Sequence, residues 1–203
     1  HEQIRDRVAF VNLTGPYSNL VDVLRSVGTG TSGEGERLRH WEPDALVENV
    51  AKNILLGSLT SIEESEQIAK LMEERLNDLT SDLSPEGAAV LRILEGGTRM
   101  QVEEALNNLP GQLISDLEYV SPETYVTDIR SPIFIMHDRE DRLIPVEESR
   151  RLTKLLQHQA DIQYAEFSFF QHVTPSGSLP IGDMIMELGQ LYRHIYAIFW
   201  LTW

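Results

Sequence analysis

The chain has 203 residues, no cysteine and a formal net charge of −15. Its 41% hydrophobic and 24% charged residues are ordinary for a globular protein that buries its own core. Proteins that bind a phosphate backbone need a basic surface, so the charge argues against nucleic acid as a partner. Without cysteine, disulfides and thiolate metal sites are excluded. We find no signal-peptide pattern and no apolar run of the ~20 residues that span a bilayer, and therefore expect a cytoplasmic protein.

The first part of the chain reads as a strand and a connection. Residues 7–13, RVAFVNL, form a candidate buried strand, and Thr14-Gly15-Pro16 ends it. The mixed apolar segment 17–27 predicts a short helix. Residues 28–35 contain four glycines and predict a loop. We assign residues 1–33 to the core of the fold on this basis.

A long helical block follows, from Trp41 to Leu117. Capping patterns mark its helices: Ser61-x-x-Glu64 opens one, Ser84-Pro85 opens the next, and Thr98-x-x-Gln101 opens another. Gly96-Gly97 is typical of a helix end. An all-helical insertion between buried strands is typical of a cap or lid, so we predict a helical cap over residues 34–124.

The most informative stretch is SPIFIMHDREDRLIP, residues 131–145. Its apolar run 132–137 predicts a strand buried on both faces of a parallel sheet. The acidic turn Asp138 to Asp141 follows, and an amphipathic helix begins after Pro145. A carboxylate just past the carboxyl end of a buried strand is where open α/β sheets hold their chemistry.

The last part of the chain repeats this order. The apolar run 162–170 predicts another strand, which ends in Gln171-His172. A terminal helix begins near Asp183 and is expected to dock on the sheet. Its apolar positions include Ile185, Leu188, Leu191, Tyr192, Ile195 and Phe199. Strand, acid, helix, strand and histidine fit the last two members of a triad ordered Ser…Asp…His.

Together these patterns predict an α/β fold, with part of a parallel sheet and an all-helical cap insertion. Residues 1–33 supply a strand and connection, residues 34–124 the cap, and residues 125–203 the remaining core with the candidate acid and base.

From these residues the chain resembles the C-terminal half of an α/β-hydrolase. In that family an apolar strand is followed by His-Gly, two variable residues, Asp, and then Val or Ile before Pro. The corresponding residues here are His137-Asp138-Arg139-Glu140-Asp141-Arg142-Leu143-Ile144-Pro145. The resemblance implies that Asp141 is the triad acid and His172 the base. Asp138 stands at the position where the family has glycine. Aspartate can replace glycine there because it adopts a left-handed backbone more readily than most residues.

The resemblance leaves the nucleophile outside these residues. No Gly-x-Ser-x-Gly elbow occurs, and the Gly-rich segment around Ser32 has neither the second glycine nor the strand and helix that frame one. We therefore expect the serine and the oxyanion loop upstream of His1, and expect the chain alone to be inactive. The same reasoning predicts self-association, because the exposed sheet edge needs a cover.

Simpler roles exist for each candidate residue. Asp141 could be no more than a cap of the helix after Pro145, and His172 could be a structural histidine with no catalytic role. Asp138 is the second candidate for the acid. The remaining histidines lack the spacing of a metal site, so we predict neither a metal nor another cofactor. Those scattered histidines are His40, His137, His158 and His194.

The parent reaction implied is hydrolysis of an ester, thioester or amide. The apolar inner faces of the cap helices suggest a small-molecule acyl substrate with a hydrophobic part. Two alternatives remain open: an acyltransferase, and a non-catalytic interaction module on a degenerate hydrolase scaffold.

Overall fold

A computed structural model describes residues 7–33, 35, 37–74, 83–158, 161–168, 170–171, 174–175 and 181–201. The chain forms two compact units. One, the sheet unit, combines residues 1–18 with 121–203. The other, the helical unit, spans residues 19–120.

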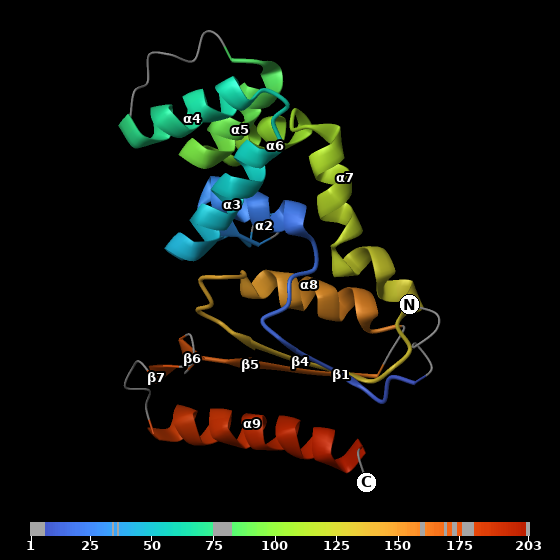
Figure 1. Ribbon diagram of the computed structural model, residues 1–203. Coiled ribbons are helices and arrows are strands. Elements are labelled where there is room, and N and C mark those ends of the chain that lie inside the picture. Colours follow the sequence, from blue (N-terminus) through green and yellow to red (C-terminus); the bar gives the residue numbers. More distant parts are fainter. Residues whose placement is uncertain are drawn as a thin grey trace. The chain divides into compact units, whose positions relative to one another are not determined.

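The sheet unit is built on three parallel strands (Figure 1). They are β1 (Val11–Thr14), β4 (Ile133–Asp138) and β5 (Ile162–Phe167), in the order β1-β4-β5. Ile133 of the central strand is paired with Val11 on one side and Ile162 on the other. The predicted α/β fold with part of a parallel sheet is therefore confirmed.

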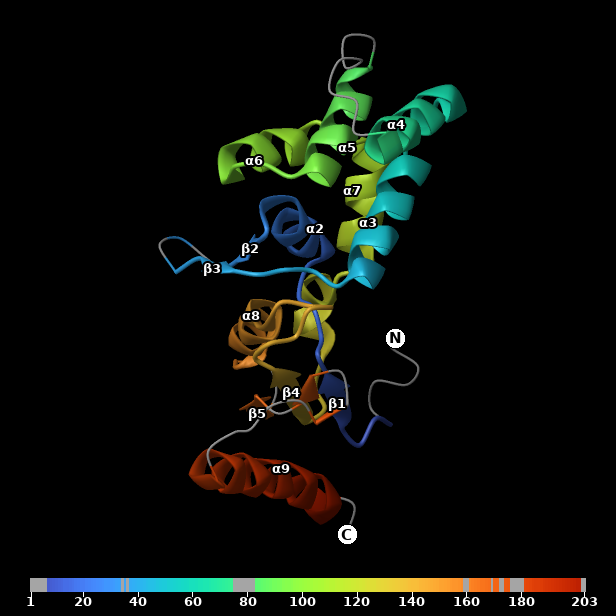
Figure 2. The ribbon, with the colours of Figure 1, turned by 90° about the vertical axis from the view of Figure 1, so that its left-hand side faces the viewer.

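Helices cover both faces of this sheet, as Figures 1 and 2 show. On one face, α8 (Val146–Leu156) packs Leu152 and Leu156 against Ile133 and Ile135 of β4. On the other face lies α9 (Ile181–Leu201), as expected of a terminal helix. The remaining elements are short: the 3-10 helix η2 (Pro122–Asp128), β6 (Phe170–Gln171) and β7 (Thr174–Pro175). The alternation of strand and helix places the carboxyl ends of β1, β4 and β5 at one edge of the sheet.

Most of the large apolar positions of α9 do not face the sheet, although Leu191 is half-buried. Glu187 and His194 are buried on the side toward the sheet, where the His194 ring meets Phe134 edge-on at 5.7 Å between centroids. Ile185 and Tyr192 are instead 64% and 69% exposed. Hydrogen-bonded polar side chains of α9 thus face the sheet, and a largely hydrophobic face of the helix is exposed.

The helical unit contains six described α-helices and a two-stranded ribbon. The helices are α2 (Leu20–Thr29), α3 (Ala45–Gly57), α4 (Ile62–Glu74), α5 (Pro85–Glu95), α6 (Arg99–Asn107) and α7 (Gly111–Tyr119). The ribbon pairs β2 (Thr31–Ser32) with β3 (Arg39–His40), and β2 lies in the segment 28–35 that was predicted as a loop. Fully buried Leu55, Ile68, Val90 and Val102 form the centre of its core.

The predicted caps define several of these helices. Thr98 and Gln101 make both bonds of a capping box at the start of α6. The Ser61 hydroxyl accepts from the Glu64 amide at 3.1 Å, as the pattern predicts. Glu64, however, also accepts from the Ser84 hydroxyl at 2.9 Å, so its carboxylate ties α4 to the start of α5.

Candidate active site

Asp141 lies in the turn that joins β4 to α8. The turn begins as the sheet ends, with the Arg139 amide still donating to the carbonyl oxygen of Phe167 at 2.7 Å. The Asp138 side chain then accepts from the Glu140 amide at 2.8 Å, a local bond that reverses the chain. Asp141 is therefore held just past the carboxyl end of the central strand, the position predicted for it.

The carboxylate of Asp141 is fixed through both of its oxygens. Its Oδ1 accepts from the amides of Leu143 at 2.6 Å and Ile144 at 3.2 Å, and its Oδ2 lies 3.5 Å from Nε2 of His137. Burial opposes ionisation, but the His137 ring and the two amides outweigh it, so the pKa of Asp141 is lowered. An ionised, oriented carboxylate is what a triad acid must supply.

His137 is the positioning residue that the sequence did not reveal. Its side chain is fully buried, and its Nε2 donates to the carbonyl oxygen of Ile144 at 3.0 Å. Its Nδ1 contacts the hydroxyl of Ser149, which in turn donates to the carbonyl oxygen of Pro16 at 2.9 Å. One imidazole thus joins β4, the turn carrying Asp141, the first turn of α8 and the loop after β1. A histidine ending an otherwise apolar strand was the available signal.

The loop after β1 also reaches the candidate acid. Gly15 adopts φ +58, and a Cβ atom at this position would stand 3.1 Å from Oδ2 of Asp141. Ser18, further along, donates its amide to the buried carboxylate of Glu148 at 3.0 Å. The end of β1 therefore lies against Asp141, and a side chain at position 15 would press on its carboxylate by a few tenths of an ångström.

Asp138, the second candidate acid, has a different environment. Its Oδ2 is buried and meets no hydrogen-bond partner among the described residues. Burial raises the pKa of Asp138, and the nearby charges of Asp141 and Glu140 raise it further. The pKa values of the two carboxyl groups are thus shifted in opposite directions, and Asp141 is the one that stays ionised more readily.

His172, the predicted base, lies outside the described residues. The residue before it, Gln171, is described and ends β6, which follows β5. The pairing of His172 with Asp141 therefore stays a prediction.

A network of charges lies beside the turn, at the carboxyl end of β5. Glu166 of β5 accepts from Arg150 of α8 through both oxygens at 2.7 Å, and from the Tyr164 hydroxyl at 2.6 Å. Arg139 adds a contact to Glu166 at 3.3 Å and another at 3.3 Å to the buried Glu187 of α9. Burial alone would raise the pKa of Glu166, but the hydrogen bonds from Arg150 and Tyr164 outweigh it and lower this pKa from 4.5 to about 2. The network ties both covering helices to the turn.

Replacing Glu166 by glutamine is expected to remove an acid-sensitive part of the stability. A carboxylate with a lowered pKa stabilises the fold above its unfolded pKa of 4.5, and this contribution disappears as the pH falls toward about 2. The wild type should thus exceed the variant in unfolding free energy at pH 7, and the gap should close in that acid range. Urea unfolding across pH measures it. Glu140→Gln, in the exposed part of the turn, is the control, and a pH-independent gap would contradict the prediction.

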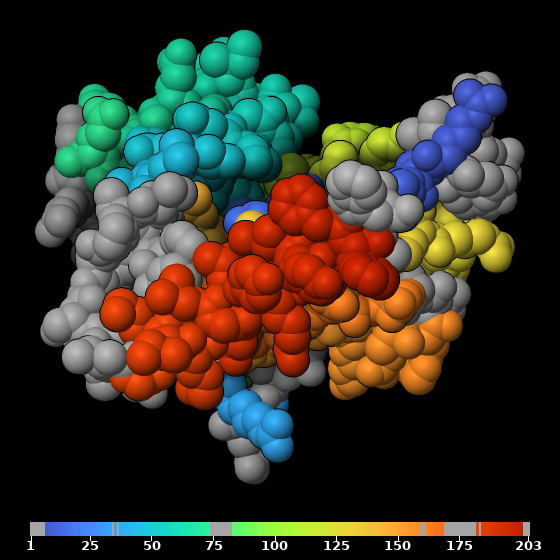
Figure 3. Space-filling model, turned by 90° about the horizontal axis from the view of Figure 1, so that it is seen from below, coloured from blue at the N-terminus to red at the C-terminus, as the bar shows by residue number. Residues whose placement is uncertain are grey.

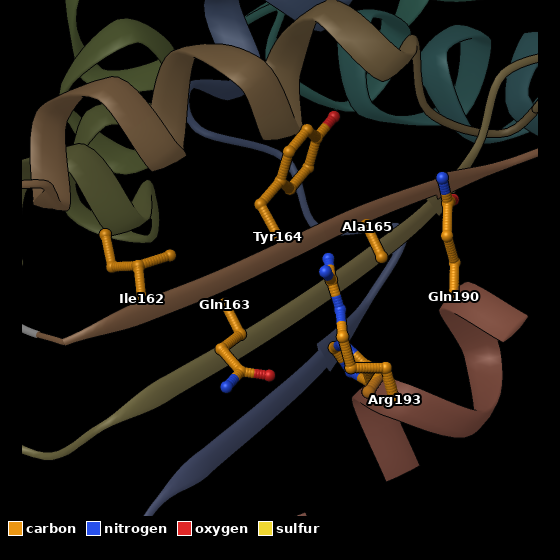
Figure 4. A pocket seen from close by; sticks show the side chains of 7 residues that line it. Ile162, Gln163, Tyr164, Ala165, Gln190 and Arg193 are labelled. Atoms are coloured by element: carbon orange, nitrogen blue, oxygen red, sulfur yellow. The ribbon is translucent and has the colours of Figure 1, made fainter. Parts of the chain in front are cut away.

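Two cavities lie on the α9 side of the sheet. The first, about 380 Å³, is lined by Ile162, Gln163, Tyr164, Ala165, Gln190, Arg193 and His194. Figure 4 shows Gln190 and Arg193 of α9 extending toward the strands, whereas the Tyr164 ring points away to the α8 side. The second, about 390 Å³, is lined by Pro132, Phe134, Asp161, Gln163, Tyr196, Ala197 and Trp200. Asp141 lines neither cavity, so we give them no part in the acyl chemistry.

No group of three or more histidine, aspartate or glutamate side chains is arranged to hold a metal ion within the described ranges. Of the helices described, none is both long and apolar enough to cross a bilayer.

Comparison with known proteins finds a similarity to an ester hydrolase over part of the chain. The chain is 30% identical over 80 residues to LipM, described as a probable carboxylic ester hydrolase, of Mycobacterium tuberculosis (strain ATCC 25618 / H37Rv). The match covers 38% of this chain and 19% of that protein, so the chain spans far less than two thirds of this relative. No protein-family model matches the chain. The chain is thus similar to an ester hydrolase over part of its length.

Proposed function

We propose that the chain supplies the acid and the base of a serine hydrolase whose nucleophile lies upstream of His1. In this proposal Asp141 is the acid and His172 the base of a Ser-Asp-His triad. The substrate is a small-molecule ester, thioester or amide with a hydrophobic acyl part. The chain by itself lacks the serine and is inactive.

The geometry of Asp141 carries this proposal. A residue whose role is to cap α8 would bond to an amide of the first helical turn, but α8 has no side-chain cap bond. Oδ1 of Asp141 instead accepts from the amides of Leu143 and Ile144, which lie in the turn before the helix. The second oxygen, Oδ2, lies 3.5 Å from Nε2 of His137 and next to Gly15, at the end of the strands. Such a carboxylate can bind the Nδ1–H of another imidazole. The similarity to an ester hydrolase supports the same assignment.

The proposed reaction follows from these positions. His172 takes the proton of the serine hydroxyl as it attacks the acyl carbon, and returns that proton to the leaving alcohol, thiol or amine. Asp141 fixes the tautomer of His172 and stabilises the imidazolium formed in between. Water then attacks the acyl carbon and loses a proton to His172. His172 returns this proton to the serine oxygen as the bond between that oxygen and the acyl carbon breaks, and the carboxylic acid is released. The helical unit would act as the cap that selects the acyl group.

We also propose self-association through the outer edge of β1. β1 is an end strand of the three-stranded parallel sheet that the structure describes. Such an edge presents unpaired backbone groups to any second strand.

Labelling with a fluorophosphonate tests the catalytic proposal. The longer polypeptide should gain a single adduct by intact-mass spectrometry, and His172→Ala should abolish it, since the serine is then not activated. This 203-residue chain alone, as the matched control, should gain none. A folded longer protein that forms no adduct would support a non-catalytic scaffold instead. In a separate assay with an acyl substrate and an alcohol acceptor, formation of a new ester instead of the free acid would identify an acyltransferase.

A further inference from the structure

The outer face of α9 is a continuous hydrophobic surface. Figure 3 looks onto this side of the sheet unit, where the red side chains of α9 form a band along the helix. We call this band the α9 stripe. Its large members are 43–73% exposed: Met184, Ile185, Leu188, Tyr192, Ile195, Tyr196, Phe199 and Trp200. Exposed apolar patches of this extent mark an interaction surface.

The spacing of the stripe is that of a helix-packing seam. Ile185, Leu188, Tyr192 and Ile195 follow one another at intervals of three, four and three residues. This is the spacing with which one helix packs against another along its length. Tyr192, Tyr196 and Trp200 add a stacked ladder, with ring centroids 5.9 and 6.1 Å apart. Stacked rings are already ordered, which lowers the entropy lost on association.

The stripe is also symmetric about Tyr192. Large exposed side chains stand four residues to either side, then seven, then eight: Leu188 with Tyr196, Ile185 with Phe199, and Met184 with Trp200. When two identical helices pack antiparallel about a twofold axis, position 192 + k faces position 192 − k. A pattern that is the same in both directions is therefore what a second copy of the same helix would match.

The open space at Gly189 and the absence of charged side chains among the described residues of the α9 stripe are both compatible with this pairing. Gly189 faces Ile195 in such a register, and a Cβ atom at Gly189 would meet nothing within 4 Å, which leaves room for the incoming side chain. The chain carries a net charge of −15, so repulsion between two copies is weakest where they meet through an uncharged face. The charged residues along this part of α9 point elsewhere: Glu187 bonds to Arg139, and Arg193 lines a cavity at β5.

The available area is sufficient for a stable contact. Aromatic side chains present about 150–250 Å² each when fully exposed, so the partly exposed members of the stripe offer on the order of 800 Å². A standard interface buries about 800 Å² per partner. We propose that two copies of this chain associate by antiparallel packing of α9 against α9, with Tyr192 at the twofold axis.

Sedimentation of the chain over a range of concentrations tests this. The wild type should form a dimer, and Leu188→Glu should raise its dissociation constant at least about 100-fold, because the charge enters the seam twice. Ile62→Glu is the matched control: Ile62 is 72% exposed on α4 and should leave the dimer unchanged. Circular dichroism confirms that both variants stay folded.

A cross-linking experiment fixes the register independently of the charge substitution. The chain has no cysteine, so Tyr192→Cys carries a single thiol. A short bismaleimide should join two such copies, but not two copies of Tyr119→Cys. A strictly monomeric wild type overturns the proposal. If that monomer binds phosphatidylcholine vesicles, the α9 stripe contacts lipid instead of a second copy. A dimer unaffected by Leu188→Glu overturns it too, and points to pairing along β1.

Discussion

Replacing Asp141 by asparagine, in the polypeptide that contains the nucleophile, is expected to lower kcat for ester hydrolysis about 10⁴-fold. Asparagine keeps the shape and can still accept from the amides of Leu143 and Ile144, so the turn should stay folded. It cannot stabilise an imidazolium, and its amide N–H₂ favours the wrong tautomer of His172. KM should change little, because the lost interaction belongs to the transition state. Steady-state kinetics with a nitrophenyl ester of a short fatty acid measure both constants.

Asp138→Asn is the control for this substitution. It removes a carboxylate of the same turn, three residues before Asp141, whose pKa is raised rather than lowered. We expect a loss of less than about tenfold, since a group outside the triad contributes little to the transition state. Equal losses at the two positions would contradict the assignment, and a larger loss at Asp138 would make it the acid.

The strand, the turn and the helix around Asp141 could be predicted because their signals are local. The run 132–137 is apolar without alternation, which fits a strand flanked by two others, and β4 is indeed the central strand. Thr98 and Gln101 show the same principle in the helical unit, where a cap within four residues makes both of its bonds. Information of this kind is contained in neighbouring residues.

The supports of the site were not predictable in the same way, because they join distant parts of the chain. The Ser149 hydroxyl reaches Pro16 across 133 positions of sequence, and Ser18 reaches Glu148 across 130. No periodicity encodes such a contact. His137 was therefore grouped with scattered histidines, although its ring holds the turn of the candidate acid.

The orientation of α9 shows a second limit. Periodicity identifies an amphipathic helix, but it does not say whether its apolar face lies on this sheet or on something else. Glu187 decides the orientation here, because Ser168 donates its amide to Glu187 at 2.9 Å and Arg139 donates at 3.3 Å. A buried carboxylate with these partners fixes the polar face inward and leaves the α9 stripe outside.

Replacing Gly15 by alanine should reduce catalysis several-fold, although position 15 takes no part in the chemistry. The new Cβ would stand 3.1 Å from Oδ2 of Asp141, so the carboxylate or the end of β1 must shift. A displacement of about 1 Å in a catalytic group can cost 10²-fold in rate, so a shift of a few tenths of an ångström should cost several-fold. The left-handed backbone adds a stability loss of about 1–2 kcal/mol. Kinetics of the longer polypeptide and urea unfolding of this chain measure the two effects.

Gly30→Ala separates crowding at Asp141 from backbone strain. Gly30 has φ +60, almost the same as the +58 of Gly15, but its nearest neighbour to an added Cβ is the Trp41 carbonyl oxygen at 3.9 Å. Both variants should therefore lose similar stability, whereas only Gly15→Ala should lose activity. If both lost activity equally, strain or unfolding would explain the effect, and the contact between Gly15 and Asp141 would have no role. If only Gly15→Ala is impaired, the loop after β1 positions the acid of the triad.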